Sequence, residues 1–377
     1  MNEGIPTGKP SSEKSAENLD NVVYKRPNIE RERGQEVVEE LSAGFKDFYK
    51  ARGYEEREPV LISSGFDPSV RFIGSHISVF KPELLEGTVP DPGNFMVQDC
   101  IRTQNSKKFF DDDYLPKWGS SFTSLGTISP AERLVDVSNE AREFLAQSLN
   151  VAQENIAIRV NSGDEDLSKA AAEAFSGSVR EVDTQPEKYY RHQIGVEGVW
   201  GRNFNIALRN ANGEGFADVG NIILIENAER KLGVELALGA TTILKQVYNV
   251  DHVNDFYPIT GLEGLDPKLG RKLEDAIITS SILLREGLAP NASDNRGRIL
   301  RTYMRAILYL QERAGLSPEQ VQTIAEQFEH RQFKTASPEA AEKISDYIAQ
   351  YRKDLLAPGG AKTPEDKVIL SVLNTSA

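Results

Sequence analysis

The chain has only one cysteine, Cys100, and four histidines among its 377 residues. A single cysteine excludes an intrachain disulfide and any zinc site that needs several cysteines. No apolar run reaches the roughly 18 residues that a membrane helix requires, and the N-terminus lacks the apolar core of a signal peptide. We therefore expect a cytoplasmic protein without a membrane anchor or a metal site.

Basic residues are also in short supply, with 44 Lys and Arg against 57 Asp and Glu and a net charge of −13. This balance argues against a general polyanion or DNA binder, although a local basic face can still bind RNA. Hydrophobic residues make up 39% of the chain, which is enough for a sizeable core and excludes wholesale disorder.

The composition changes along the chain and predicts four regions. Residues 1–34 are polar and poor in aliphatic residues, which is typical of a disordered tail. Residues 35–260 alternate strand and helix patterns, and residues 261–357 carry mainly helical patterns. Residues 358–377 are polar with a short apolar piece and are expected to be a second tail.

The strand patterns favour an antiparallel sheet, because short turns connect them. Residues 205–209 and 215–219 flank the turn at 210–213, which is a hairpin signal. We also expect short strands at 60–62 and 70–73 and a buried helix over 235–247. The helical region should contain helices over 269–286 and 295–314.

Several segments share their order with one known family, at residues 45–54, 67–72, 80–87, 100–103, 122–126, 219–223, 286–287 and 295–305. They resemble the alanyl-tRNA synthetase family of class II aminoacyl-tRNA synthetases. In this resemblance, residues 45–54 correspond to the opening helix, and residues 67–72 with 80–87 correspond to the first class II motif. Residues 100–103 match the strand that carries the motif 2 arginine.

The resemblance runs from about residue 35 to 316 and implies an α+β fold. That fold is the class II synthetase antiparallel sheet flanked by helices, followed by an all-helical domain that faces tRNA. The similarity stops before the family's editing and oligomerisation domains. We therefore expect a truncated and diverged paralogue with a catalytic domain over 35–260.

The resemblance also implies roles for individual residues in binding ATP, with Mg²⁺, and a small amino acid. Arg102 would hold the α-phosphate, and Lys107 or Lys108 an outer phosphate. Glu235 would pair with the ammonium group of the substrate. Gly239 of motif 3, Asn221, His192 and Trp200 would complete the two pockets.

The chain departs from the family where the chemistry is most demanding. Thr242 replaces the motif 3 arginine, and a hydroxyl cannot form the bidentate phosphate contact of a guanidinium. Residues 119–124 lack the family's two histidines and its adenine-side glutamate. Arg202, in a glycine-rich loop, is the candidate replacement cation for catalysis.

The helical region carries an arginine stripe at helical spacing. Arg298, Arg301 and Arg305 fall on one face, and Asn295 aligns with a family residue near the identity base pair of the tRNA acceptor stem. A stripe of this kind suits a phosphate backbone. The alternative is an ordinary amphipathic helix whose arginines pair with neighbouring acids.

Three hypotheses follow. The first is a ligase that forms an aminoacyl-adenylate and transfers the acyl group to tRNA or another acceptor. The second is a paralogue that binds nucleotide, amino acid or tRNA without catalysis, because the motif 3 arginine is missing. The third is a regulatory partner of another protein. The substrate, the acceptor, turnover and the oligomeric state stay open.

Overall fold

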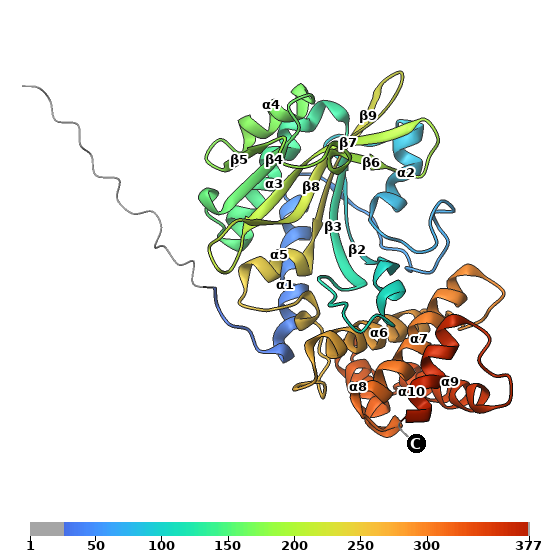
Figure 1. The fold of residues 1–377 in the computed structure, drawn as a ribbon. Coiled ribbons are helices and arrows are strands. Elements are labelled where there is room, and N and C mark those ends of the chain that lie inside the picture. The colour runs from blue at the N-terminus through green and yellow to red at the C-terminus, as the bar shows by residue number, and fades with distance from the viewer. Residues whose placement is uncertain (1–25, 376–377) are drawn as a thin grey trace, which may run out of the picture.

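The structure is a computed structural model that describes residues 26–375. A large sheet with its helices forms one part of the molecule, and five helices from α6 onward form the other (Figure 1). The strands occur in the order β1-β2-β3-β9-β8-β7-β4-β5, with β6 paired to β7. Their bounds are β1 (Glu55–Glu56), β2 (Asn94–Ile101), β3 (Ser121–Ser129), β4 (Ile156–Val160), β5 (Val179–Val182), β6 (Arg191–Gln193), β7 (Val199–Arg209), β8 (Phe216–Asn227) and β9 (Lys231–Gly239).

The centre of the sheet is antiparallel, as the short turns predicted. Each strand pairs antiparallel with its neighbour along the spatial order β2-β3-β9-β8-β7-β4. The two outer pairs, β1 with β2 and β4 with β5, are parallel, so the sheet as a whole is mixed. The expected fold class, α+β with a following helical region, is confirmed.

Helices pack on both faces of the sheet. One face carries α1 (Gly34–Lys50), α3 (Leu134–Leu149), α4 (Glu165–Ala174) and α5 (Ala240–Val247), whose apolar side chains share one core with the strands. Phe45 of α1 and Phe144 of α3 meet edge to face there, with ring centroids 5.3 Å apart. The other face carries α2 (Ile77–Glu86), which packs Phe80 and Leu84 against the strands.

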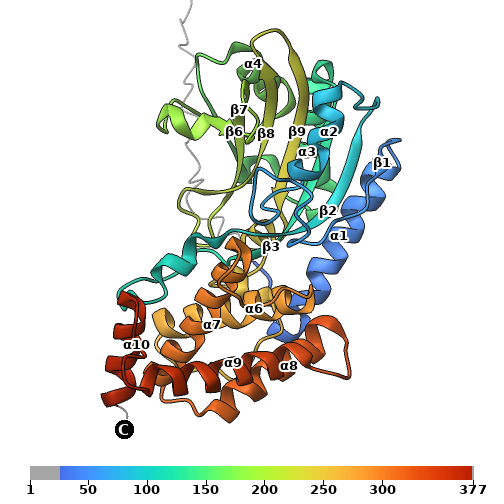
Figure 2. The same ribbon diagram turned by 90° about the vertical axis from the view of Figure 1, so that its right-hand side faces the viewer.

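A second core is built mainly by α6 (Pro267–Arg285), α7 (Asn295–Ala314), α8 (Pro318–Phe333), α9 (Glu339–Leu356) and α10 (Pro364–Thr375). It also includes Ile62, Phe72, Ile101 and Phe109 of the first part. Figure 2 shows α8, α9 and α10 at the bottom of the view, below the sheet. The buried carboxyl of Asp275 joins the two parts. Its Oδ1 accepts from the backbone nitrogen of Ser120 at 2.6 Å, and its Oδ2 accepts from Asn105 at 3.0 Å.

Four local predictions were wrong. Residues 235–239 belong to strand β9, and the helix α5 starts only at Ala240. Residues 60–62 and 70–73 form irregular structure instead of strands. Within residues 358–377, expected to be a tail, α10 buries Ile369 and Leu373 in the helical core. The tail predicted at the N-terminus lies largely outside the described residues.

A bulge interrupts the pairing of β7 with β8. Ile206 pairs with Gly220, but Ala207 pairs with Asp218, so Val219 is an extra residue on β8. A bulge of one residue reverses the side-chain alternation beyond it. Asp218 therefore shares a sheet face with Asn205, to which it is hydrogen-bonded at 3.4 Å. Gly220 fits here because a Cβ would lie 2.3 Å from the carbonyl oxygen of Ala237.

None of the helices within residues 26–375 has the length and apolar character needed to cross a lipid bilayer.

Candidate ligand-binding site

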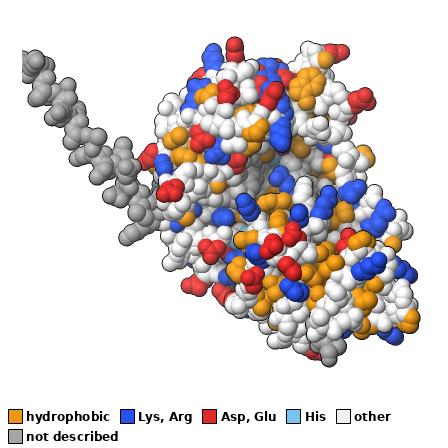
Figure 3. Space-filling model, viewed as in Figure 1, with side chains coloured by type: hydrophobic (Ala, Val, Ile, Leu, Met, Phe, Trp, Pro, Cys, Tyr) orange, Lys and Arg blue, Asp and Glu red, His pale blue; other side chains and the backbone are white. Residues whose placement is uncertain are grey.

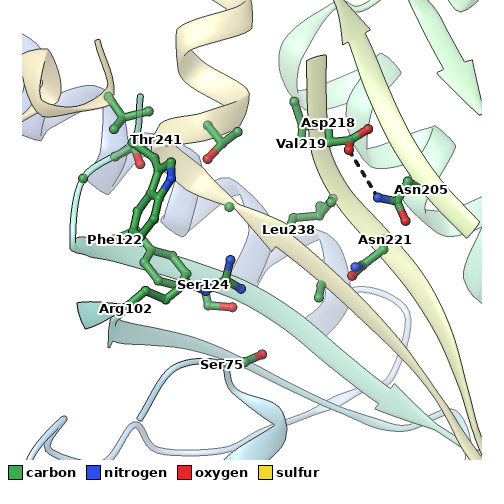
Figure 4. A pocket seen from close by; sticks show the side chains of 17 residues that line it. Ser75, Arg102, Phe122, Ser124, Asn205, Asp218, Val219, Asn221, Leu238 and Thr241 are labelled. Atoms are coloured by element: carbon green, nitrogen blue, oxygen red, sulfur yellow. Dashed lines mark hydrogen bonds between the residues drawn. The ribbon is translucent and has the colours of Figure 1, made fainter. Parts of the chain in front are cut away.

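A pocket of about 290 Å³ lies on the sheet face that carries Asn205 and Asp218. Figure 4 shows Arg102, Phe122 and Ser124 on one side of it and Asn205, Asp218 and Asn221 on the other. Ala237, Leu238 and Gly239 of β9 lie between them, and Gly119 and Gly220 also line the pocket. Glycines leave room for a ligand to approach the backbone closely.

Arg102 is the cation of this pocket. It follows the last residue of β2, and its guanidinium carbon lies 5.0 Å from the ring centroid of Phe122. Within residues 26–375 no carboxylate forms a salt bridge with it. A guanidinium stacked on a ring and left without a counter-ion is suited to a phosphate or carboxylate.

His76 is a buried neighbour of the pocket-lining residue Ser124. Its Nδ1 lies 2.8 Å from Oγ of Ser124, which lines the pocket, and its Nε2 lies 3.0 Å from Oε1 of Glu235 without the alignment of a good hydrogen bond. The imidazole rests on Gly126, where a Cβ would meet it at 2.0 Å. Glu235 is therefore buried beside the imidazole and does not line the pocket, although it was predicted to meet the substrate.

Other predicted residues do lie at the pocket. Asn221 and Gly239 line it, and the amide nitrogen of Asn221 lies 3.3 Å from Nε2 of His192. Burial lowers the pKa of His192, the charge of Glu235 opposes this shift, and the charge of Arg102 adds to it. The structure thus brings His192 within electrostatic reach of both charged residues.

Arg202, the candidate replacement cation, is held by carboxylates away from the pocket lining. Its Nε lies 2.6 Å from Glu226, and its Nη1 lies 2.9 Å from Asp166 and 3.2 Å from Asp164. The hydrogen bonds that Arg202 donates to Glu226 and Asp166 raise its pKa further. Trp200 donates to the same Glu226 from an exposed position. The guanidinium of Arg202 is thus paired with three carboxylates, one from β8 and two from the start of α4.

The predicted lysines follow Arg102 in the 3₁₀-helix Thr103–Lys108 and are exposed. Lys108 pairs with Asp111 at 3.5 Å, and neither lysine lines the pocket. The run Asp111–Asp113 is likewise paired, since Asp112 contacts Arg313 and Asp113 contacts Lys268. No group of three acids, histidines or cysteines suited to a metal exists within residues 26–375.

The arginine stripe of α7 is only partly open. Asn295 and Arg298 are exposed and hydrogen-bonded to each other. Arg301 contacts the hydroxyl of Tyr347 at 3.4 Å. Arg305 lies over the ring of Tyr351 and 3.4 Å from Asp366 of α10. The stripe is thus intermediate between the two predicted arrangements, with its N-terminal end free and its C-terminal end paired.

A second depression, of about 380 Å³, lies at the end of β2 and is lined by residues 70–72, Gly74 and residues 101–104. It contains Arg71 and Arg102, and Arg296 of α7 donates to the backbone oxygen of Arg71 at 2.5 Å. Figure 3 shows a hollow between the two parts of the molecule, with Lys and Arg side chains along its lower rim. Sequence reasoning missed Arg71 and Arg296 as neighbours of this hollow.

Sequence reasoning also missed Asn205, Asp218 and Phe122 as pocket residues. Phe122 follows from the alternation of β3, which places it on the same face as Ser124. Asp218 could not be found that way, because the bulge reverses the alternation before it reaches that residue.

Comparisons with known proteins agree with the resemblance seen in the sequence. The chain is 23% identical over 318 residues to an alanine–tRNA ligase from Shewanella loihica, covering 70% of this chain and 35% of that protein. No protein-family model matches the chain.

Solved structures of class II synthetases are remote. A threonyl-tRNA synthetase from Aeropyrum pernix is 16% identical with a TM-score of 0.39, covering 68% of this chain and 70% of the other. Asparaginyl-tRNA synthetase from Pyrococcus horikoshii, complexed with asparaginyl-adenylate, is 8% identical with a TM-score of 0.38, covering 61% and 68%. TM-scores this low carry no argument about the pocket.

The sequence similarity and the fold agree with each other. The chain spans about a third of the length of the ligase that it matches, and it contains the antiparallel strands and the helical region expected of that part. The chain is a homologue of an alanine–tRNA ligase, with the α+β fold and following helical region that this similarity predicts.

Proposed function

We propose that the pocket binds ATP and a small amino acid and joins them as an aminoacyl-adenylate, the first step of aminoacyl-tRNA synthesis. The observation that carries this proposal is the unpaired guanidinium of Arg102 in a pocket lined by glycines. Negative charge develops on the α-phosphate while the carboxylate attacks it, and a fixed cation stabilises that charge. Arg102 stands where the family's motif 2 arginine is expected.

Mg²⁺ would arrive with the nucleotide. This ion is usually held by one or two carboxylates together with the phosphates of a substrate. The phosphates of the nucleotide would supply protein-independent ligands to the ion, and within residues 26–375 no cluster of acids forms a dedicated metal cage.

A second candidate function is binding without turnover. Two observations favour it: Thr242 lines the pocket in place of the motif 3 arginine, and Arg202 is committed to Glu226, Asp164 and Asp166. The pocket then has one unpaired cation for a triphosphate that carries several charges. Such a protein would retain nucleotide or amino-acid affinity and lose most of the rate.

Replacing Arg102 by alanine should weaken ATP binding at least tenfold, which corresponds to about 1.4 kcal/mol. Isothermal titration calorimetry measures the affinity, and amino-acid-dependent ATP–pyrophosphate exchange measures activation. Lys343→Ala, an exposed substitution on α9, is the matched loss of one positive charge and should change neither. Equal ATP affinity in Arg102→Ala and the unaltered protein would contradict the proposal. ATP binding without exchange would favour the second candidate.

We further propose that the helical region, together with the depression at Arg71, contacts the acceptor stem of a tRNA. Arg71 and Arg298 lack salt bridges within residues 26–375 and are exposed, whereas Arg305 is paired with Asp366. The division at about residue 261 is part of this proposal, with the catalytic site before it and the RNA contact, apart from that of Arg71, after it.

Replacing Arg298 by alanine should weaken tRNA binding and lower the slope of log affinity against log salt by about 1, because one phosphate contact is lost. Filter binding at several salt concentrations measures the slope. Arg305→Ala serves as the comparison, since its guanidinium already pairs with Asp366, and it should lower the slope less. A larger effect at Arg305 than at Arg298 would show that this assignment of the RNA face is wrong.

A further inference from the structure

The carboxylate that lines the pocket is Asp218, not Glu235. The side chain of Glu235 is 3% exposed and lies against His76, and it is absent from the pocket lining. An imidazole nitrogen at 3.0 Å occupies the approach to its Oε1. A substrate ammonium would have to displace this buried ring to reach Glu235.

The side chain of Asp218 is exposed to the pocket, whereas that of Glu235 is buried. The bulge at Val219 turns its side chain onto the pocket face, where it is 36% exposed and hydrogen-bonded to Asn205. Asn221 lies on the same face, three positions along β8, and also lines the pocket. These three side chains form a polar wall opposite Arg102, as Figure 4 shows.

Asp218 is fixed in place without being fully neutralised. Nη1 of Arg159 lies 2.5 Å from Oδ1 of Asp218, and Nε of the same arginine lies 2.7 Å from Glu181. One guanidinium thus serves two carboxylates, which leaves one negative charge. Tyr189 donates to Oδ2 at 2.5 Å, and each carboxylate oxygen has two acceptor sites, so Asp218 can still accept from a ligand.

We propose that Asp218, with Asn205, recognises the ammonium group of the substrate in place of Glu235. This inference rests on the proposed function, because the substrate is then an amine-bearing carboxylic acid whose carboxylate is activated near Arg102. A charged ammonium loses much of its hydration in the pocket, and the excess negative charge at Asp218 compensates that loss. The two opposite charges also fix the direction in which the substrate binds.

The test uses non-hydrolysable 5′-O-(N-acyl)sulfamoyladenosines of alanine, β-alanine and propionic acid, the last without an amine. Calorimetry on the unaltered protein should show at least tenfold tighter binding of one amine-bearing analogue than of the propionyl analogue. Asp218→Asn should remove this preference, and Glu235→Gln should keep it. Thermal unfolding and ATP affinity of each variant report whether it is folded.

Each other outcome contradicts the inference. If Asp218→Asn kept the preference for an amine, Asp218 would not be the residue that recognises the ammonium group. If Glu235→Gln lost the preference, Glu235 would be that residue. Equal binding of all three analogues would show that no ammonium is recognised. Binding of ATP but of no analogue would also overturn the inference, whereas binding of neither would overturn the proposed function itself.

Discussion

Asparagine in place of Asp275 should stabilise the protein progressively, relative to the unaltered chain, as the pH rises from 4 to 7. Burial raises the pKa of Asp275 to about 6, against an ordinary value of 3.8. The carboxyl is enclosed between α6 and the sheet, where it accepts hydrogen bonds from Ser120 and Asn105. These hydrogen bonds oppose the shift but do not cancel the cost of desolvation.

The direction follows from proton uptake on folding. Below pH 3.8 the carboxyl is protonated in both states, and its contribution to stability is fully present. Between 3.8 and about 6 the unfolded chain loses this proton before the folded chain does, so stability falls as the pH rises. A shift of about two pKa units corresponds to roughly 3 kcal/mol by pH 7.

Denaturant unfolding of the two proteins at several pH values measures this effect. The difference in unfolding free energy, unaltered minus Asp275→Asn, should fall by roughly 3 kcal/mol across this range. Asp113→Asn is the control, because that side chain is 97% exposed and should show no such trend. Parallel curves for the unaltered and Asp275→Asn proteins would contradict an ionised, buried Asp275 at neutral pH.

Alanine at Gly126 should destabilise the protein by about 1–3 kcal/mol, as overpacking of a buried site does. The new Cβ would lie 2.0 Å from the imidazole of His76, which is itself fully buried. The ring would have to leave Ser124 and Glu235 together. The change would therefore also remove the contact that His76 makes with the pocket residue Ser124.

A double-mutant cycle separates this clash from the loss of glycine. His76→Ala combined with Gly126→Ala should be more stable than the sum of the two single changes predicts, because the ring that clashes is gone. Gly44→Ala in α1 is the control, since no atom lies within 4 Å of its Cβ and alanine favours a helix. Strict additivity at positions 76 and 126 would refute the contact.

The order of the helices and strands could be predicted from the sequence better than the residues at which each of them begins and ends. The hairpin at residues 210–213 and the helix Asn295–Ala314 have strong local signals, a turn in one case and a capped helical pattern in the other. The prediction of a helix over residues 235–239 was wrong because no intervening turn separates β9 from α5 in the sequence. The two faces of this stretch pack against different layers, which only tertiary structure reveals.

The site was predicted in part, and the misses have a common physical cause. Arg102, Asn221 and Gly239 follow from the resemblance and line the pocket. Arg202 and Arg305 are placed on suitable elements, but carboxylates from distant segments pair with them, Asp166 in one case and Asp366 in the other. A cation's availability depends on such long-range partners, which no local pattern contains.

The bulge at Val219 determines which face of the sheet carries Asp218. A β8 strand of the same length that paired without the bulge would place Asp218 opposite Leu208, whose side chain lies in the core shared with α1 and α3. Loss of Val219 itself would instead remove the extra residue and keep Asp218 opposite Ala207, on the pocket face. In related sequences, a one-residue gap at this point of the strand would therefore mark a regular strand whose acidic residue still faces the pocket.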